Sequence, residues 1–422
     1  MNKLERYFYD LVKKNPSLKN KVRNLYQSFF DLVPKRNCIT DFPILNRQGY
    51  FFGFHDHSPF SGNGKYLLAQ KAPNKFFMPT TEDKLRIGFF YEKNHTEFEE
   101  CTTSSTWNWH MGCKLQWVGE TNSFIFNDIK DGKGISRLVN IESKSNEIID
   151  CQLSSISKDG NTLVGYDFFK LESYMPGYGY RNYKKDYFID NKNMKIYLLD
   201  LRNNIKKEIF SVNDLKLIKP EKTMNDSFHY LSHALFSPCS KKFCFLHRWI
   251  IDPNDIRNRK SRLIICSNEG EILAILPSDG MFSHFCWRND RELIGYCSTK
   301  KYKAAYHLFS FKKDGSLENV EKITNLLSDG HPSTNAIGNI MITDSYPNAL
   351  RLQSLYIYDF GSKTTKCIGK FLMPEKFQTK KVENHWCVDL HPRLNKNGTI
   401  VCFDNAYSGV RSLATIDISS LL

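Results

Sequence analysis

A β unit that recurs seven times is the feature that most constrains this chain. Each copy has an inner strand, a Ser-Pro or polar turn, an Asn-Gly or Asp-Gly pair or another polar turn, and an apolar strand. The clear copies span residues 54–70, 154–167, 232–247 and 389–404, with weaker ones at 112–128, 283–297 and 331–344. Their starts, near 54, 110, 154, 233, 284, 331 and 389, are 44 to 79 residues apart. β units of roughly 40–60 residues that stack on one another are typical of propeller blades.

The repeat therefore predicts an all-β fold, a seven-bladed β-propeller over residues 41–422. The third unit is the longest and leaves room for an excursion at 172–187, rich in Tyr and Gly, which we expect at the ligand end. The last strands, ending at RSLATIDIS, are expected to close the ring. Two packed β domains are the alternative fold.

Residues 1–40 predict an N-terminal helical extension that is basic and amphipathic. Apolar residues follow 3-4 spacing on both sides of Pro16, and residues 1–37 hold nine basic and three acidic side chains. Such a helix can lie on an anionic membrane surface or pack as a cap on the main domain, and the cap is the simpler interpretation.

Composition narrows the class of protein. No apolar run reaches the roughly 18 residues of a membrane-spanning helix, and the start lacks the apolar stretch of a secretory signal. We therefore expect a cytoplasmic protein, peripheral at the inner membrane face if the basic helix binds lipid. The net charge is +14, but Lys and Arg are mostly dispersed and no nucleic-acid-binding motif accompanies them. An acidic glycan or an anionic lipid surface suits such charge better than a nucleic acid.

Histidine placement is the main indication of function. Seven of the twelve histidines stand at or just before the first strand of a predicted blade: His55, His57, His110, His233, His284, His331 and His391. In a propeller the innermost strands line the central channel, so we expect these side chains to converge. Imidazole suits metal ligation and proton transfer near neutral pH.

The most ligand-like group is Asp389 with His391, together with His331 one blade earlier. Such a set would suit Zn²⁺ or Mn²⁺. Arg248 and Arg393 could pair with carboxylates, whereas the basic stretch 257–262 is expected to be a solvated turn. Trp287 could stack on a sugar or pack between sheets. For glycoside hydrolysis, Asp56, Asp344, Asp389 and Asp404 are the first choices.

The segment YFFGFHDHSPFSGNGKYLL (50–68), with SHALFSP…FLHRW and DLHPRL…FD, resembles an uncharacterised group of bacterial proteins. These are often encoded with surface-polysaccharide biosynthesis genes and read more like FFGYYDKSPW at the first motif. The likeness covers most of the chain. The resemblance implies that the protein acts on a bacterial surface polysaccharide, such as a capsule polysaccharide or an O-antigen.

More distantly, the chain resembles propeller-type polysaccharide lyases, chiefly oligogalacturonate lyase and, less closely, ulvan lyase. The resemblance implies that His284 matches the proton-abstracting histidine and His331 a metal-binding one. His391 matches the first histidine of a His-Pro-His metal motif, which reads His391-Pro392-Arg393 here. Asp389 stands near the position of an amide ligand. Arg393 stands where the motif has its second histidine, so this chain has lost one ligand of the set.

The leading hypothesis is β-elimination next to a uronate in an acidic polysaccharide. Arg248 or a metal would neutralise the carboxylate, His284 or His233 would remove the proton, and Tyr178 or Tyr180 would protonate the leaving oxygen. Substrate contacts would come from the remaining candidates: His55, Asp56, His57, His110, Arg393 and Trp287. Glycosyl transfer or hydrolysis in capsule or O-antigen assembly, and non-catalytic glycan binding or scaffolding, are the alternatives.

Overall fold

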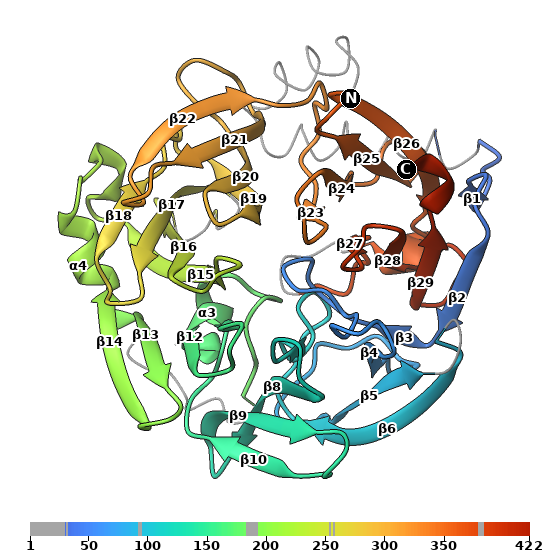
Figure 1. The fold of residues 1–422 in the computed structure, drawn as a ribbon, viewed down its shortest axis with the longest axis horizontal. Coiled ribbons are helices and arrows are strands. Elements are labelled where there is room, and N and C mark those ends of the chain that lie inside the picture. Colours follow the sequence, from blue (N-terminus) through green and yellow to red (C-terminus); the bar gives the residue numbers. More distant parts are fainter. Residues whose placement is uncertain are drawn as a thin grey trace.

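Seven antiparallel sheets surround a central channel in the computed structural model of the chain, which describes residues 30, 33–91, 95–182, 193–252, 255, 258–378 and 384–422 (Figure 1). In five sheets the strands follow one another in chain order from the channel outwards, and in the other two a strand from the beginning of the chain is added at the outer edge. The prediction of a seven-bladed β-propeller is confirmed.

The first four blades are formed entirely by consecutive strands. Blade 1 contains β3 (Tyr50–Phe51), β4 (Leu67–Lys71), β5 (Leu85–Tyr91) and β6 (Glu97–Ser104). Blade 2 contains β7 (Gln116–Trp117), β8 (Ser123–Lys130), β9 (Lys133–Asn140) and β10 (Asn146–Ile149). Blade 3 contains β11 (Ser155–Ile156), β12 (Thr162–Tyr166), β13 (Lys195–Asp200) and β14 (Ile205–Ser211). Blade 4 contains β15 (Phe228–Phe236), β16 (Lys242–Ile250), β17 (Arg259–Ser267) and β18 (Ile272–Ile275).

The last three blades include the ring closure. Blade 5 contains β19 (Phe282–Asn289), β20 (Glu292–Cys297), β21 (Ala305–Phe311) and β22 (Leu317–Lys322). Blade 6 contains β23 (Ser333–Thr334), β24 (Ile340–Asp344), β25 (Leu352–Asp359) and β26 (Thr364–Leu372), and blade 7 contains β27 (Arg393–Leu394), β28 (Ile400–Asn405) and β29 (Ser412–Asp417).

The ring is closed by the beginning of the described chain. Strand β2 (Ile44–Gln48) pairs with β29 as the outermost strand of blade 7, and β1 (Cys38–Ile39) pairs with β26 as a fifth strand of blade 6. The last strand RSLATIDIS therefore needs a partner from residues 44–48, which the repeat did not identify. Both ends of the ring are held in one sheet. The predicted helix over residues 1–37 falls almost wholly outside the described residues.

The apolar cores lie between neighbouring blades. Blades 3 and 4 share one cluster that contains Val164, Tyr166, Phe243 and Phe245, all fully buried. Strand β16 (KFCFLHRWI) is covered on both faces and is buried at every position after Lys242. Blade-to-blade burial of this kind stabilises the ring and holds the inner strands around the channel.

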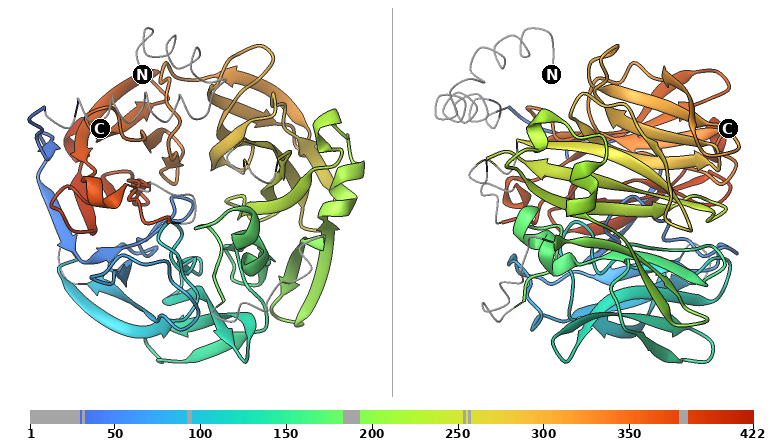
Figure 2. Two further views of the ribbon diagram at one scale, coloured as in Figure 1. Left: turned by 180° about the vertical axis from the view of Figure 1, so that it is seen from behind. Right: turned by 90° about the vertical axis from the view of Figure 1, so that its left-hand side faces the viewer.

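One face of the ring carries the long connections. The loop from β12 to β13 holds α3 (Phe168–Tyr174), which Asp167 caps, and the link from blade 3 to blade 4 holds α4 (Val212–Leu217). Both helices lie on the same side in the edge-on view (Figure 2). Short 3₁₀ turns occur at Lys222–Met224, Glu375–Phe377 and Ser419–Leu421. Within the described part of the chain, no helix has the length and apolarity to span a membrane.

A candidate active site in the central channel

Six of the seven histidines predicted to converge do so. We call them the channel histidines: His55, His110, His233, His284, His331 and His391. The His331 ring lies 4.3 Å, centroid to centroid, from both the His284 and His391 rings, and 5.3 Å from the His55 ring. Phe54 stacks on His233 at 4.7 Å and joins the group at its centre. All six are at most 7 % exposed.

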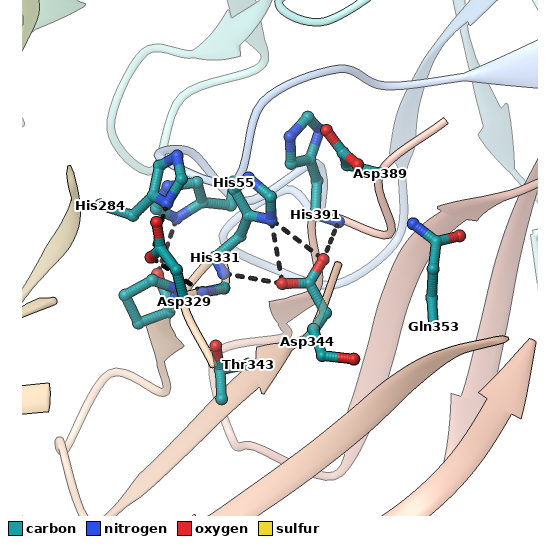
Figure 3. Close-up of polar contacts among 12 residues, drawn as sticks. His55, His284, Asp329, His331, Thr343, Asp344, Gln353, Asp389 and His391 are labelled. Atoms are coloured by element: carbon teal, nitrogen blue, oxygen red, sulfur yellow. Dashed lines mark hydrogen bonds and ion pairs between the residues drawn. The ribbon is translucent and has the colours of Figure 1, made fainter. Parts of the chain in front are cut away.

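Three channel histidines have one ring nitrogen fixed and the other without a partner (Figure 3). His55 Nδ1 lies 2.7 Å from the Pro332 carbonyl oxygen, and His391 Nδ1 lies 2.8 Å from that of Gly53. His331 Nδ1 faces both oxygens of Asp344, at 2.9 and 3.0 Å. Carbonyl and carboxylate oxygens only accept, so each Nδ1 donates a proton. Each Nε2 is buried and has no hydrogen-bond partner among the described residues.

The backbone explains how His391 is seated. Gly53 has φ of 112°, and a Cβ there would lie 2.8 Å from the Met111 carbonyl carbon. Its backbone N–H and that of Phe52 both donate to Asp404, while Asp344 accepts from the backbone N–H groups of His331 and His391. Two buried carboxylates thus fix the loops that carry the histidines.

His284 forms a second carboxylate–histidine pair. Its Nδ1 lies 3.1 Å from Asp329 Oδ1, and the other oxygen of Asp329 accepts from Ser283 Oγ at 2.6 Å. The pairing holds the ring with Nδ1 protonated and Nε2 as the basic nitrogen, the tautomer that a general base requires.

Arg248 is a buried cation beside this group. Its side chain is 3 % exposed, Nη1 contacts the Met175 sulfur at 3.2 Å, and Nε has no hydrogen-bond partner among the described residues. Its positive charge, with that of Arg259, contributes to the lowered pKa of His233 and opposes the rise in the pKa of Tyr178. Buried guanidinium groups are normally paired with a carboxylate, and no carboxylate of the described residues pairs with Arg248, so this group could bind an anion.

Burial keeps most of these imidazoles neutral. It lowers the pKa of His55, His110, His233 and His391 well below the usual value, and that of His284 despite the opposing effect of Asp329. His331 differs, because the charge and hydrogen bonds of Asp344 outweigh burial and raise its pKa. Burial and the nearby carboxylates raise the pKa of Asp389 to about 6.

A cavity of about 310 Å³ opens beside the channel histidines. Its walls include His110, Tyr178, Tyr346, Arg351 and Asp389. Tyr178 stacks on His110 with ring centroids 4.7 Å apart, and Tyr346, still 42 % exposed, has its ring centroid 5.6 Å from that of His331. All come from loops on the face that carries α3, so a ligand of a few sugar units could reach the histidines from that face.

Among the residues that the structure describes, two groups of side chains have ligand atoms close enough together to hold a cation. His110, Asp389 and His391 form one, and His110, His385 and Cys387 form the other; within each the ligand atoms lie within 4.8 Å of one another. Asp389 and His391 were expected from the sequence. His331, expected as the third ligand, lies beside His391 but outside the first group, whose third position is taken by His110.

Three predicted site residues line this cavity, namely His110, Tyr178 and Asp389, whereas His284, His233 and Arg248 do not. Four other predicted site residues make contacts that hold the fold together. Arg393 is fully buried, with Nη1 3.4 Å from Asp404 and further contacts to the carbonyl oxygens of Gly53 and Phe54. Trp287 lies in the core between blades 4 and 5. Asp56 pairs with Lys114, and His57 Nε2 lies 3.3 Å from the Ser154 carbonyl oxygen. These side chains are committed to holding loops and blades together, because a buried charge or ring needs a partner.

Two smaller expectations also change. Tyr180 is buried in the core, where its hydroxyl accepts from Asn127, so it does not reach the cavity as Tyr178 does. The basic stretch expected to be a solvated turn over 257–262 forms the start of β17 from Arg259 onwards.

Sequence reasoning missed Asp329, Tyr346, His385 and Cys387. Asp329 and Tyr346 have no local pattern that marks them. The other two do: from 385 to 391 the chain reads His-Trp-Cys-Val-Asp-Leu-His, with ligand-type side chains on every second residue. Alternate residues of an extended chain point to one side, and the intervening Val388 and Leu390 are fully buried. That alternation was the available signal.

Comparison with known proteins supports the fold. No family model matches the chain, and no curated protein matches it in sequence. Among solved structures, an oligogalacturonate lyase in complex with manganese aligns over 91 % of this chain and 98 % of its own, with a TM-score of 0.61 and 13 % identity. Oligogalacturonate lyase from Vibrio parahaemolyticus aligns over 92 % and 100 %, with a TM-score of 0.60 and 13 % identity.

A prolyl endopeptidase aligns over 97 % of this chain and 53 % of its own, with a TM-score of 0.51 and 8 % identity. At these identities the likeness establishes the propeller architecture, which serves several unrelated reactions.

Proposed function

We propose that this protein is a lyase that cleaves an acidic glycan by β-elimination next to a uronate, with the help of a divalent cation. The observation that carries the proposal is the convergence of channel histidines beside the buried Arg248, where several ring nitrogens have no hydrogen-bond partner, and Arg248 no carboxylate partner, among the described residues. The fold it shares with oligogalacturonate lyase supports the same reaction class. The substrate that fits is an acidic polysaccharide or oligosaccharide, such as one from a bacterial surface.

Arg248 binds the carboxylate of the uronate in this proposal. A guanidinium group pairs with a carboxylate through two parallel hydrogen bonds, and this pairing is stronger where water is excluded. Neutralising the carboxylate makes the adjacent carbon–hydrogen bond more acidic, because the negative charge that develops on deprotonation spreads onto that carboxylate.

His284 removes the proton, with His233 as the neighbouring candidate. His284 Nε2 takes the proton from the carbon next to the carboxylate, the electron pair forms a carbon–carbon double bond, and the bond to the glycosidic oxygen breaks. That oxygen leaves with a proton from a tyrosine hydroxyl of the cavity, Tyr178 or Tyr346. Burial raises the pKa of Tyr178, and partial burial together with the charges of Asp329 and Asp389 raises that of Tyr346, so both are protonated and able to donate.

The chain's own residues fit a cation such as Mn²⁺ or Zn²⁺. His331 and His391 each offer an unpartnered Nε2 whose ring is fixed by a hydrogen bond from Nδ1, the arrangement usual for histidine ligands, and Asp389 offers a carboxylate. Asp344 holds a proton on His331 and by the same charge would raise the basicity of its Nε2. A bound cation would supply Lewis-acid stabilisation of the carboxylate. Arg393 stands where the resemblance expects a further histidine ligand, so this chain offers one ligand fewer at that site.

Hydrolysis is less well supported than elimination. It needs two carboxyl groups on either side of the scissile bond. Of the four aspartates considered from the sequence, Asp56 is paired with Lys114, Asp344 with His331, and Asp404 with Arg393 and two backbone N–H groups. Asp389 alone among these four lines the 310 Å³ cavity.

The cellular setting remains a prediction of the sequence. We propose a cytoplasmic protein whose residues 1–37 contact the anionic inner membrane face, where lipid-linked precursors of surface polysaccharides are assembled. Vesicle binding by the full chain, lost when residues 1–37 are deleted, would support this setting.

The test is mass spectrometry of acidic polysaccharides, including polyuronates, after incubation with the protein and Mn²⁺. Elimination gives fragments with an unsaturated end, lighter by one water than hydrolysis products. His284→Ala should abolish their formation, whereas His307→Ala, in the same blade but outside the channel, should not. Hydrated fragments, or full activity in His284→Ala, would contradict the proposal.

A further inference from the structure

The outer wall of the channel holds a second set of ligand-type side chains that the proposed reaction does not use. His385 and Cys387 precede Asp389 and His391 on the alternating segment, and both line the 310 Å³ cavity. His110 lies across from them and completes the set. This set differs from the set of His331, Asp389 and His391 in that it contains a thiol, that of Cys387.

Two of the three distances between the ligand atoms match those of a tetrahedral metal site, and the third lies within 4.8 Å. His110 Nε2 lies 3.3 Å from His385 Nδ1 and 3.4 Å from Cys387 Sγ. With metal–nitrogen bonds of about 2.0–2.1 Å and metal–sulfur bonds of about 2.3 Å, neighbouring ligand atoms of a tetrahedron lie roughly 3.3–3.6 Å apart. One ring nitrogen makes a single hydrogen bond, so His110 Nε2 cannot serve both neighbours well, whereas a cation would engage all three atoms.

The other nitrogen of His110 adds a second, independent observation. Its Nδ1 has no hydrogen-bond partner among the described residues but lies 3.6 Å from Asp389 Oδ2. A cation on Nε2 would fix the proton on Nδ1, where it faces this carboxylate. Histidine ligands of zinc commonly donate their second N–H to a carboxylate in this manner.

The backbone is shaped to bring His385 into place. Gly177 has φ of 88°, and a Cβ there would lie 2.3 Å from the His385 Cβ. The next residue, Tyr178, stacks on His110 and holds that ring from the opposite side. The loop after α3 and the segment before blade 7 are thus fitted to each other around the three ligands.

We propose that His110 Nε2, His385 Nδ1 and Cys387 Sγ form a binding site for a thiophilic divalent cation of the Zn²⁺ class. The site is separate from the His331–Asp389–His391 site and stands whether or not the elimination reaction is correct. Thiolate and imidazole ligands select zinc over manganese. The ligands line the cavity, so the fourth position is open to water or to an oxygen of a bound glycan.

Cobalt(II) titration of the full-length protein tests the proposal, because a thiolate ligand gives a sulfur-to-cobalt charge-transfer band that nitrogen and oxygen ligands do not. The wild-type protein should show this band at about one equivalent, and Zn²⁺ should displace it. Cys387→Ser should abolish the band. Cys239→Ser, which removes an exposed thiol from the β15–β16 turn, should leave it unchanged.

Gly177→Ala keeps all three ligands but should displace His385 and weaken Co²⁺ binding by at least roughly tenfold, as outer-shell changes do. If circular dichroism shows that Cys387→Ser does not fold, Gly177→Ala provides the test instead. A wild-type protein without the band would overturn the proposal, as would a band that persists in folded Cys387→Ser. Equal Co²⁺ affinity of Gly177→Ala and wild type would likewise contradict it.

Discussion

Two groups of buried histidines differ in how their ring nitrogens are partnered. In blade 4, Arg262 Nε donates to His247 Nδ1 at 3.2 Å, His247 Nε2 donates to His229 Nδ1 at 2.8 Å, and His229 Nε2 donates to the Met224 carbonyl at 3.1 Å. Every ring nitrogen of His229 and His247 therefore has a hydrogen-bond partner. Of the six channel histidines, five have a ring nitrogen with no hydrogen-bond partner among the described residues: His55, His110, His233, His331 and His391.

The difference separates a structural cluster from a site. An unpartnered buried polar atom costs about 1–3 kcal/mol, so folding alone favours the arrangement in blade 4. One such atom is not diagnostic, since His307 Nε2, which lies apart from the channel, also has no hydrogen-bond partner in the described part of the chain. Five such nitrogen atoms around one channel together lower the stability of the folded protein, and a bound ligand or cation would offset this loss.

The two arginines that accompany these groups give the largest expected contrast. Arg248→Met should lower kcat/KM on an acidic glycan by roughly 100-fold, because the charge that neutralises the carboxylate is lost. Its stability should be unchanged or higher, since an unpaired buried charge is removed. Arg262→Met is the matched variant. It should keep the turnover of the folded protein and lose stability, because Arg262 also donates to the Leu215 and Lys219 carbonyls.

Initial rates and urea unfolding of both variants make the measurement. Reversed outcomes, with Arg248→Met unstable but active, would remove the distinction between the two groups.

The pH dependence of stability should expose the blade 4 pair. Burial lowers the pKa of His229 to about 4 and that of His247 well below its usual value, whereas an unfolded histidine titrates near 6.5. The unfolded chain therefore takes up protons first, so the stability from the neutral rings is complete above about pH 6.5 and is lost as the pH falls towards 4. Each ring contributes a slope of up to about 1.4 kcal/mol per pH unit.

Urea unfolding between pH 7.5 and 4.5 checks this prediction. The double variant His229→Gln/His247→Gln should be less stable at pH 7.5 and show a shallower loss on acidification. A slope equal to that of the wild type would mean that the pair does not control the acid response.

The smallest expected effect on turnover is that of Trp287→Phe. The indole packs between blades 4 and 5, beside Phe311 at 5.9 Å, and lies apart from the channel histidines. The change should cost about 1–3 kcal/mol of stability through lost packing and leave kcat and KM within twofold. A large rise in KM would instead place this ring in the glycan site, as the sequence allowed.

The fold could be predicted because each blade repeats a local pattern. Turn residues, Gly pairs and apolar runs mark a strand wherever they occur, and the blade starts that they indicate predicted the convergence of six histidines. The ring closure by β2 could not be read in this way, because residues 44–48 lie before the first repeat and pair with a strand almost at the other end of the chain.

Individual roles depend on contacts that no local pattern encodes. His57 and His55 are two residues apart in the same motif, yet one faces Ser154 and the other joins the channel group. From the sequence Arg393 could bind a carboxylate of a ligand, but in the structure it pairs with Asp404. Asp329, which fixes His284, comes from a turn 45 residues away.

Manganese binding followed by electron paramagnetic resonance is the most direct test, because it asks without a known substrate whether the unpartnered nitrogens form a site. Free Mn²⁺ gives a sharp signal that falls on binding. The account predicts stoichiometric binding by the wild type, its loss in His391→Gln, and its retention in His247→Gln and Cys387→Ser. No binding by the wild type, or equal binding by His391→Gln, would contradict it.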